Sequence, residues 1–113
     1  MPRVYVPYPE KHKRPKGFGS LCPHMSPHEP QRLLDLAISL PGVAQNALWI
    51  ANGRWIFQLH PTTGGGPDAW HGFPIIGGDA DERVLSALVS SGRITKHDAK
   101  QIRGQRELPE EYP

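Results

Sequence analysis

The chain has 113 residues and a formal net charge of +2, and this length is typical of one domain. No apolar run approaches the ~20 residues that a membrane-spanning helix needs, and a single cysteine excludes a disulfide within the chain. Because the N-terminal residues also lack the apolar core of a signal peptide, we expect a cytoplasmic protein with no membrane partner.

Residues 1–20 contain four prolines, which are incompatible with a regular helix or a central strand. We predict an extended or disordered basic arm here, although Val4, Tyr5, Val6 and Tyr8 could dock along the domain as an edge segment. Residues 21–106 are expected to form a single α+β domain, followed by an acidic tail over residues 107–113. The arm carries four closely spaced basic side chains that we expect to contact a nucleic acid or an acidic partner: Lys11, Lys13, Arg14 and Lys16.

The first helix is predicted over residues 27–40. Ser26 is a good N-cap, Pro27 suits the first helical position, and Glu29 completes a capping box. Proline and glycine at 41–42 end the helix. Its apolar stripe recurs with the helical period and consists of Leu33, Leu34, Ala37, Ile38 and Leu40.

A β-hairpin is predicted over residues 47–60, because Asn52-Gly53 separates two runs rich in β-branched and aromatic residues. A two-residue loop at these positions would pair Ile50 with Trp55. One face of the hairpin is then apolar and should point inward: Leu48, Ile50, Trp55, Phe57 and Leu59. The other face is mixed, with Trp49, Ile56, Gln58 and His60, and we expect it to be half exposed.

A third strand is predicted over residues 70–76, and because Pro74 cannot donate to a strand ladder, this strand should lie at a sheet edge or end at that point. Two helices follow, over residues 80–91 and 96–103, and Thr95 with Asp98 should cap the second. The predicted fold class is therefore α+β: a small three-stranded antiparallel sheet with helices packed on one face. The last helix presents a basic side, predicted to contact a nucleic acid or an acidic partner, with Lys96, Lys100 and Arg103.

Two of the six histidines, His60 and His71, end one predicted strand and begin the next, so sheet formation could bring them together. Two imidazoles with Arg54 would suit metal-independent cleavage of RNA, one acting as base and one as acid while the cation stabilises the developing oxyanion. The competing interpretation is that both histidines only pack beside a tryptophan at the strand ends.

A metal site finds little support in the sequence. Cys22, His24 and His28 offer ligand types within seven residues, but structural zinc usually takes four ligands in two separated pairs. We expect no metal and no cofactor.

Two functional hypotheses follow, and the sequence leaves open whether the chain is an enzyme. The first is a small non-catalytic binding module for a protein, for example an inhibitor or accessory protein, or for a nucleic acid. The alternative is a small metal-independent ribonuclease, of the size found among bacterial toxins, that uses His60 and His71. The expected partner-binding residues of the first hypothesis are Trp49, Arg54, Ile56, Gln58 and Trp70.

Overall fold

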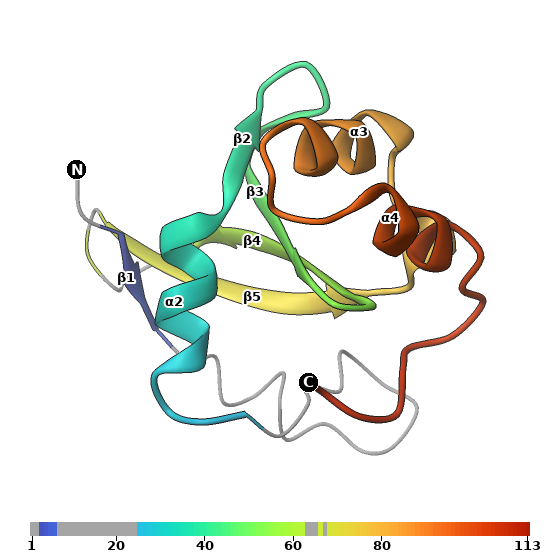
Figure 1. Cartoon of the computed structure of the whole chain (residues 1–113). Coiled ribbons are helices and arrows are strands. Elements are labelled where there is room, and N and C mark those ends of the chain that lie inside the picture. The colour runs from blue at the N-terminus through green and yellow to red at the C-terminus, as the bar shows by residue number, and fades with distance from the viewer. Residues whose placement is uncertain (1–2, 7–24, 63–65, 67) are drawn as a thin grey trace.

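The computed structural model describes residues 3–6, 25–62, 66 and 68–113. A single mixed sheet lies between helices on both of its sides (Figure 1). In chain order, the elements are β1 (Val4–Tyr5), α2 (Glu29–Leu36), β2 (Ile38–Leu40), β3 (Ala44–Asn52), β4 (Trp55–Pro61), β5 (Ala69–Ile75), the short 3-10 helix η1 (Gly77–Asp79), α3 (Glu82–Ser90) and α4 (Lys96–Arg103).

The sheet has five strands in the order β1-β5-β4-β3-β2, so the α+β class is confirmed but the three-stranded sheet is wrong. The three predicted strands form its centre, and the two additional strands lie at its edges. β5 is therefore not an edge strand, but it ends at Ile75, directly after Pro74. β1 comes from the predicted N-terminal arm and pairs in parallel with β5, Val4 opposite Ala69 and Tyr5 opposite Trp70. Residues 7–24, which hold the arm's basic cluster, lie outside the described residues.

The predicted helix 27–40 is too long, because α2 ends at Leu36 and β2 occupies the last three of those positions. Leu33 and Leu34 are buried on one side of the sheet, whereas Ile38 and Leu40 pack on the other side. The chain therefore leaves the α2 side and enters the sheet as an edge strand, which a continuous helix cannot do. The predicted capping box is also absent: the N-cap is His28, with no side-chain cap bond.

The hairpin forms, with a register shifted by two residues from the prediction. Ile50 pairs with Phe57 rather than Trp55, and Asn52 is the last strand residue, so the loop is Gly53-Arg54. Gly53 has φ of 58° and is the only residue of this loop with positive φ. Since side chains alternate with a period of two, this shift leaves every residue on its predicted face.

The inward face of the hairpin packs under α2, as predicted. We call the buried set on this side the α2-side cluster: Leu33, Leu34, Ala37, Leu48, Ile50, Trp55, Phe57 and Leu59. The C-terminal segment, residues 105–113, runs back to the same side, where Leu108 and Tyr112 pack against the cluster (Figure 1).

The opposite face is buried as well, so the expectation of a half-exposed second face is wrong. Trp49 retains 3% exposure and Ile56 0%, because α3 and α4 pack on them. The buried residues on this side form the α3/α4-side cluster: Ala47, Trp49, Ala51, Ile56, Val84, Leu85, Leu88, Ile94, Ala99 and Ile102. A sheet covered on both faces explains why its central strands carry apolar residues at consecutive positions.

Helix α4 begins and ends where the sequence predicts. Thr95 accepts a hydrogen bond from the Asp98 backbone, and Asp98 accepts one from the Thr95 backbone in return, which completes the capping box. Arg103 at the end of α4 forms an ion pair with Glu82 at the start of α3, with 2.9 Å from Nε to Oε2. This contact ties the two helices together at their ends.

The C-terminal segment is held to the domain by a polar cluster around Glu29. The Tyr112 hydroxyl donates to the Glu29 carboxylate, and Arg32 binds the same carboxylate at 2.6 Å. Asn52 donates to the Tyr112 oxygen at 2.8 Å, and the Trp55 indole donates to the Glu111 carbonyl at 2.7 Å. The segment thus connects α2 with the hairpin turn.

The polar cluster around Glu29 makes the stability depend on pH. Hydrogen bonds from Arg32, followed by that from Tyr112, lower the pKa of Glu29 from 4.5 to about 2. A lowered pKa means that the ionised carboxylate favours the folded state. This contribution is present above pH 4.5 and is lost as the pH falls through about 2. We therefore expect the free energy of unfolding, measured with urea, to decline across this range, and Glu29→Gln to make the decline shallower.

A matched control is Glu110→Gln in the C-terminal segment, where the side chain is exposed. The control should keep the acid decline of the wild type. An unchanged decline in Glu29→Gln would contradict the prediction. At alkaline pH the sign is reversed: burial raises the pKa of Tyr112 from 10 to about 12, so its contribution is lost as the pH rises through this interval.

Candidate functional site

The candidate site is a pair of histidines on the sheet face that also carries the α3/α4-side cluster. His60 of β4 and His71 of β5 are directly opposite one another in the antiparallel register. Their ring centroids lie 6.5 Å apart, with the ring planes inclined by 37°. Both residues are half-buried. The strand register thus brings together two side chains that are eleven positions apart in the sequence.

Three neighbouring side chains surround the histidine pair. Gln58 precedes His60 by two residues, so it shares its face, and its Nε2 lies 2.9 Å from His60 Nε2. Thr62 Oγ1 lies 2.9 Å from His71 Nδ1. The Phe73 ring stacks on the His60 ring with centroids 5.6 Å apart and planes inclined by only 8°. Each imidazole is therefore oriented by a polar neighbour, and His60 by an aromatic ring as well.

This arrangement can carry out proton transfer at one bound group. Imidazole is the side chain that most readily gains and loses a proton near neutral pH. Two imidazoles on the same surface can act on one substrate, one taking a proton while the other gives one. Phe73 adds an aromatic surface of the kind that nucleobases stack on.

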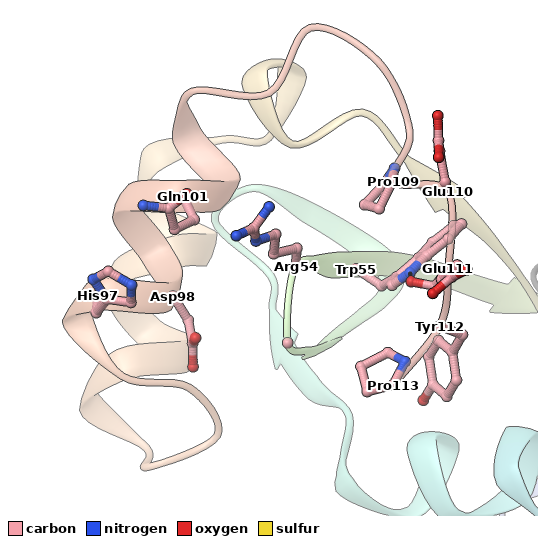
Figure 2. Close-up of a pocket in the computed structure, with 11 residues that line it drawn as sticks. Arg54, Trp55, His97, Asp98, Gln101, Pro109, Glu110, Glu111, Tyr112 and Pro113 are labelled. Atoms are coloured by element: carbon pink, nitrogen blue, oxygen red, sulfur yellow. Dashed lines mark hydrogen bonds between the residues drawn. The ribbon is translucent and has the colours of Figure 1, made fainter.

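Arg54 does not belong to this site, contrary to its predicted role beside the histidines. It lies in the hairpin turn, six residues before His60, which is roughly 20 Å along an extended strand. Instead, Arg54 lines a separate pocket of about 760 Å³ between α4 and the C-terminal segment. Figure 2 shows its side chain between Gln101 of α4 and Pro109 of the C-terminal segment.

The five predicted partner-binding residues do not share one surface. Trp49 and Ile56 are buried beneath α3 and α4, so neither is available to a partner. Trp70 packs on the opposite side, against the α2-side cluster. Gln58 is half-buried beside His60. The consecutive apolar residues of β3 and β4 are the sequence signal for burial on both faces, which the reasoning from alternation overlooked.

The basic side of α4 is smaller than predicted. Lys96 and Lys100 are exposed, whereas Arg103 is engaged by Glu82. Of the possible metal ligands near the first helix, Cys22 and His24 lie outside the described residues, and His28 is exposed at the start of α2. Within the described part of the chain, no three His, Cys, Asp or Glu residues are grouped so that they could hold a metal ion.

Thr62 and Phe73 are site residues that sequence reasoning missed. Thr62 follows His60 by two positions, and Phe73 follows His71 by two positions. Because side chains two positions apart along a strand share a face, this spacing could have indicated both residues. Their assignment also needs the register between β4 and β5, which follows only from the assembled sheet.

Comparison with known proteins adds no functional information. No protein-family model, curated protein or solved structure matches this chain. None of the helices in the described ranges has the length and apolar character that crossing a membrane requires. Function is therefore inferred from the geometry of the chain itself.

Proposed function

We propose that this protein is a small ribonuclease that cleaves RNA without a metal ion, with His60 and His71 as its acid–base pair. The observation that carries the proposal is their direct pairing across β4 and β5, with ring centroids 6.5 Å apart. Both residues are half-buried, and each ring has a polar neighbour at 2.9 Å. This organisation favours proton transfer over simple packing.

The proposed substrate follows from the chemistry of two imidazoles. RNA carries its own nucleophile, the 2′-hydroxyl, next to each phosphodiester. A base that removes the hydroxyl proton and an acid that protonates the leaving oxygen are sufficient functional groups for the transfer. DNA has no such hydroxyl and should not be a substrate. The Gln58 amide and the Thr62 hydroxyl each lie 2.9 Å from an imidazole nitrogen, so these two groups, rather than Arg54, are the polar neighbours of the proposed acid–base pair.

The test is cleavage by the purified protein in EDTA. We expect a single-stranded RNA to be cut into fragments with a 2′,3′-cyclic phosphate and a 5′-hydroxyl. The matched control is the same oligonucleotide with 2′-deoxyribose throughout, which should remain intact. Loss of cleavage in EDTA, or equal cleavage of both oligonucleotides, would contradict the proposal.

A second candidate function, binding of a nucleic acid or an acidic protein through α4, is supported by the exposure of Lys96 and Lys100. Each phosphate contact contributes about 0.9 to the slope of log affinity against log salt concentration. The Lys96→Ala/Lys100→Ala variant should therefore flatten the slope for double-stranded DNA by up to about 2. Arg106→Ala, an exposed cation beyond α4, is the control and should leave the slope unchanged. Equal slopes in all three proteins would exclude α4 as the contact surface.

A further inference from the structure

The C-terminal segment, residues 105–113, lies against the α2-side cluster in the manner of a bound peptide. We infer that the site under this segment binds an extended, tyrosine-containing segment of a partner protein, and that Tyr112 occupies the site from within the chain until the partner displaces it. The site lies on the sheet face opposite to His60 and His71. The inference therefore goes beyond the proposed ribonuclease and does not depend on it.

The surroundings of Tyr112 fit both an aromatic ring and a hydroxyl. The ring lies beside Trp55 and Phe57, with centroid distances of 6.3 and 6.2 Å. Its hydroxyl donates to the Glu29 carboxylate and accepts from the Asn52 amide at 2.8 Å. One end of the site is thus aromatic, and the other end holds one acceptor and one donor. Because phenylalanine would satisfy only the aromatic end, the site is selective for tyrosine.

The residue before the tyrosine is contacted through its backbone. The Trp55 indole N–H donates to the Glu111 carbonyl at 2.7 Å, whereas the Glu111 side chain is exposed (Figure 2). Glu110 is exposed as well. Every residue type has a carbonyl, so this hydrogen bond can form with any residue at that position. A partner therefore needs an extended backbone with a tyrosine, and not the particular acidic residues of this chain.

The segment that fills the site has few contacts with the rest of the protein. Residues 105–113 contain no helix or strand. In the described structure, the Glu111 carbonyl is the one backbone group of residues 106–113 with a hydrogen bond. A pocket of about 760 Å³ lies between residues 109–113 and α4, so the segment is not packed on that side. Segments of this kind open locally at a small cost in free energy, while the domain stays folded.

The attached segment and a partner compete for the same site. Attachment gives the segment an effective concentration of the order of millimolar. A free peptide at micromolar concentration should therefore bind the wild type poorly, but it should bind a variant in which Tyr112 no longer fills the site. This difference distinguishes a binding site from a region that is only packed.

The test uses a synthetic peptide with the sequence of residues 106–113, titrated calorimetrically into the full-length Tyr112→Ala variant. We expect one peptide per chain and an affinity at least about tenfold higher than for the wild type. A peptide with the Tyr112→Phe change should bind about tenfold more weakly, because it lacks the hydroxyl that contacts the Glu29 carboxylate. Absence of binding to Tyr112→Ala, or equal binding of both peptides, would overturn the inference.

Further variants locate the bound peptide and keep the test valid if Tyr112→Ala unfolds. The Tyr112→Phe protein retains the ring, so it should fold and bind the peptide with an affinity between those of the wild type and Tyr112→Ala. Adding Asn52→Ala to either variant should weaken binding, because Asn52 donates to the tyrosine oxygen. Asp35→Asn on α2, an exposed position bonded to Gln31, is the control and should leave binding unchanged.

A second copy of this chain is the competing occupant, and sedimentation distinguishes it from a partner protein. We expect the wild type to be monomeric with respect to this site, because its own Tyr112 fills it. A wild-type dimer that is lost in Tyr112→Ala would show that two copies exchange their C-terminal segments. That result would overturn the assignment to a partner protein.

Discussion

Replacing either His60 or His71 by alanine is expected to abolish cleavage of RNA while the protein stays folded. General acid and base groups each contribute about 10²–10⁴-fold to a rate, so either single loss should bring cleavage close to background. The fold should tolerate both changes, because both residues are half-buried rather than fully buried. The double variant should lose little more than each single one, since both groups act in the same step.

The measurement is the initial rate of RNA cleavage in EDTA, combined with thermal unfolding followed by circular dichroism. His97→Ala provides the matched control, because His97 is an exposed histidine on α4, away from the strand pair. It should cleave at the wild-type rate. If His97→Ala lost activity to the same degree, or if His60→Ala and His71→Ala kept theirs, the paired histidines would not be the reacting groups.

Trp49→Ala is expected to destabilise the protein by about 3–5 kcal/mol, which is typical of removing a large buried aromatic side chain. Trp49 is 3% exposed and packs between the sheet and the helices α3 and α4. For a domain of this size that loss is a large fraction of the total stability, which for folded proteins is commonly about 5–15 kcal/mol. The free energy of unfolding from urea titration measures the effect.

Two further variants calibrate the Trp49 result. Leu36→Ala removes an apolar side chain that is 39% exposed, so its effect should be much smaller. Ile56→Val removes one methyl group from a fully buried position and should cost about 0.5–1.5 kcal/mol, which keeps the protein folded. Had Trp49 been a partner-binding residue, its replacement would lower affinity and spare stability. A stable Trp49→Ala protein would therefore contradict the packing described above.

Burial of the second sheet face changes where a functional surface can lie. Helices α3 and α4 occupy the region that the hairpin pattern assigned to a partner, since Trp49 and Ile56 are packed beneath them. On the same face, Gln58, His60, His71 and Phe73 are half-buried. Under the proposed function, RNA would bind at this polar and aromatic group.

Local features were predictable because they depend on a few neighbouring residues. The capping box of Thr95 and Asp98 is satisfied within a single turn, and α4 has the predicted bounds. The reversal of the chain near Gly53 and the inward direction of Leu48, Ile50, Trp55, Phe57 and Leu59 follow from a glycine-containing turn and an alternation with a period of two. The predicted face of each hairpin residue was correct even though the predicted pairing of the two strands was shifted by two residues.

Only the tertiary structure decided the edge strands, the second core and the histidine pair. β1 and β2 are two and three residues long, too short for a periodic pattern, and each forms because a neighbouring strand offers backbone hydrogen bonds. Burial of Trp49 depends on helices that are distant in the sequence. The proximity of His60 and His71 depends on the register of β5 against β4, which places the two residues directly opposite one another. The sequence by itself determined which side chains share a face, because that property is local, whereas what covers each face is a property of the assembled chain.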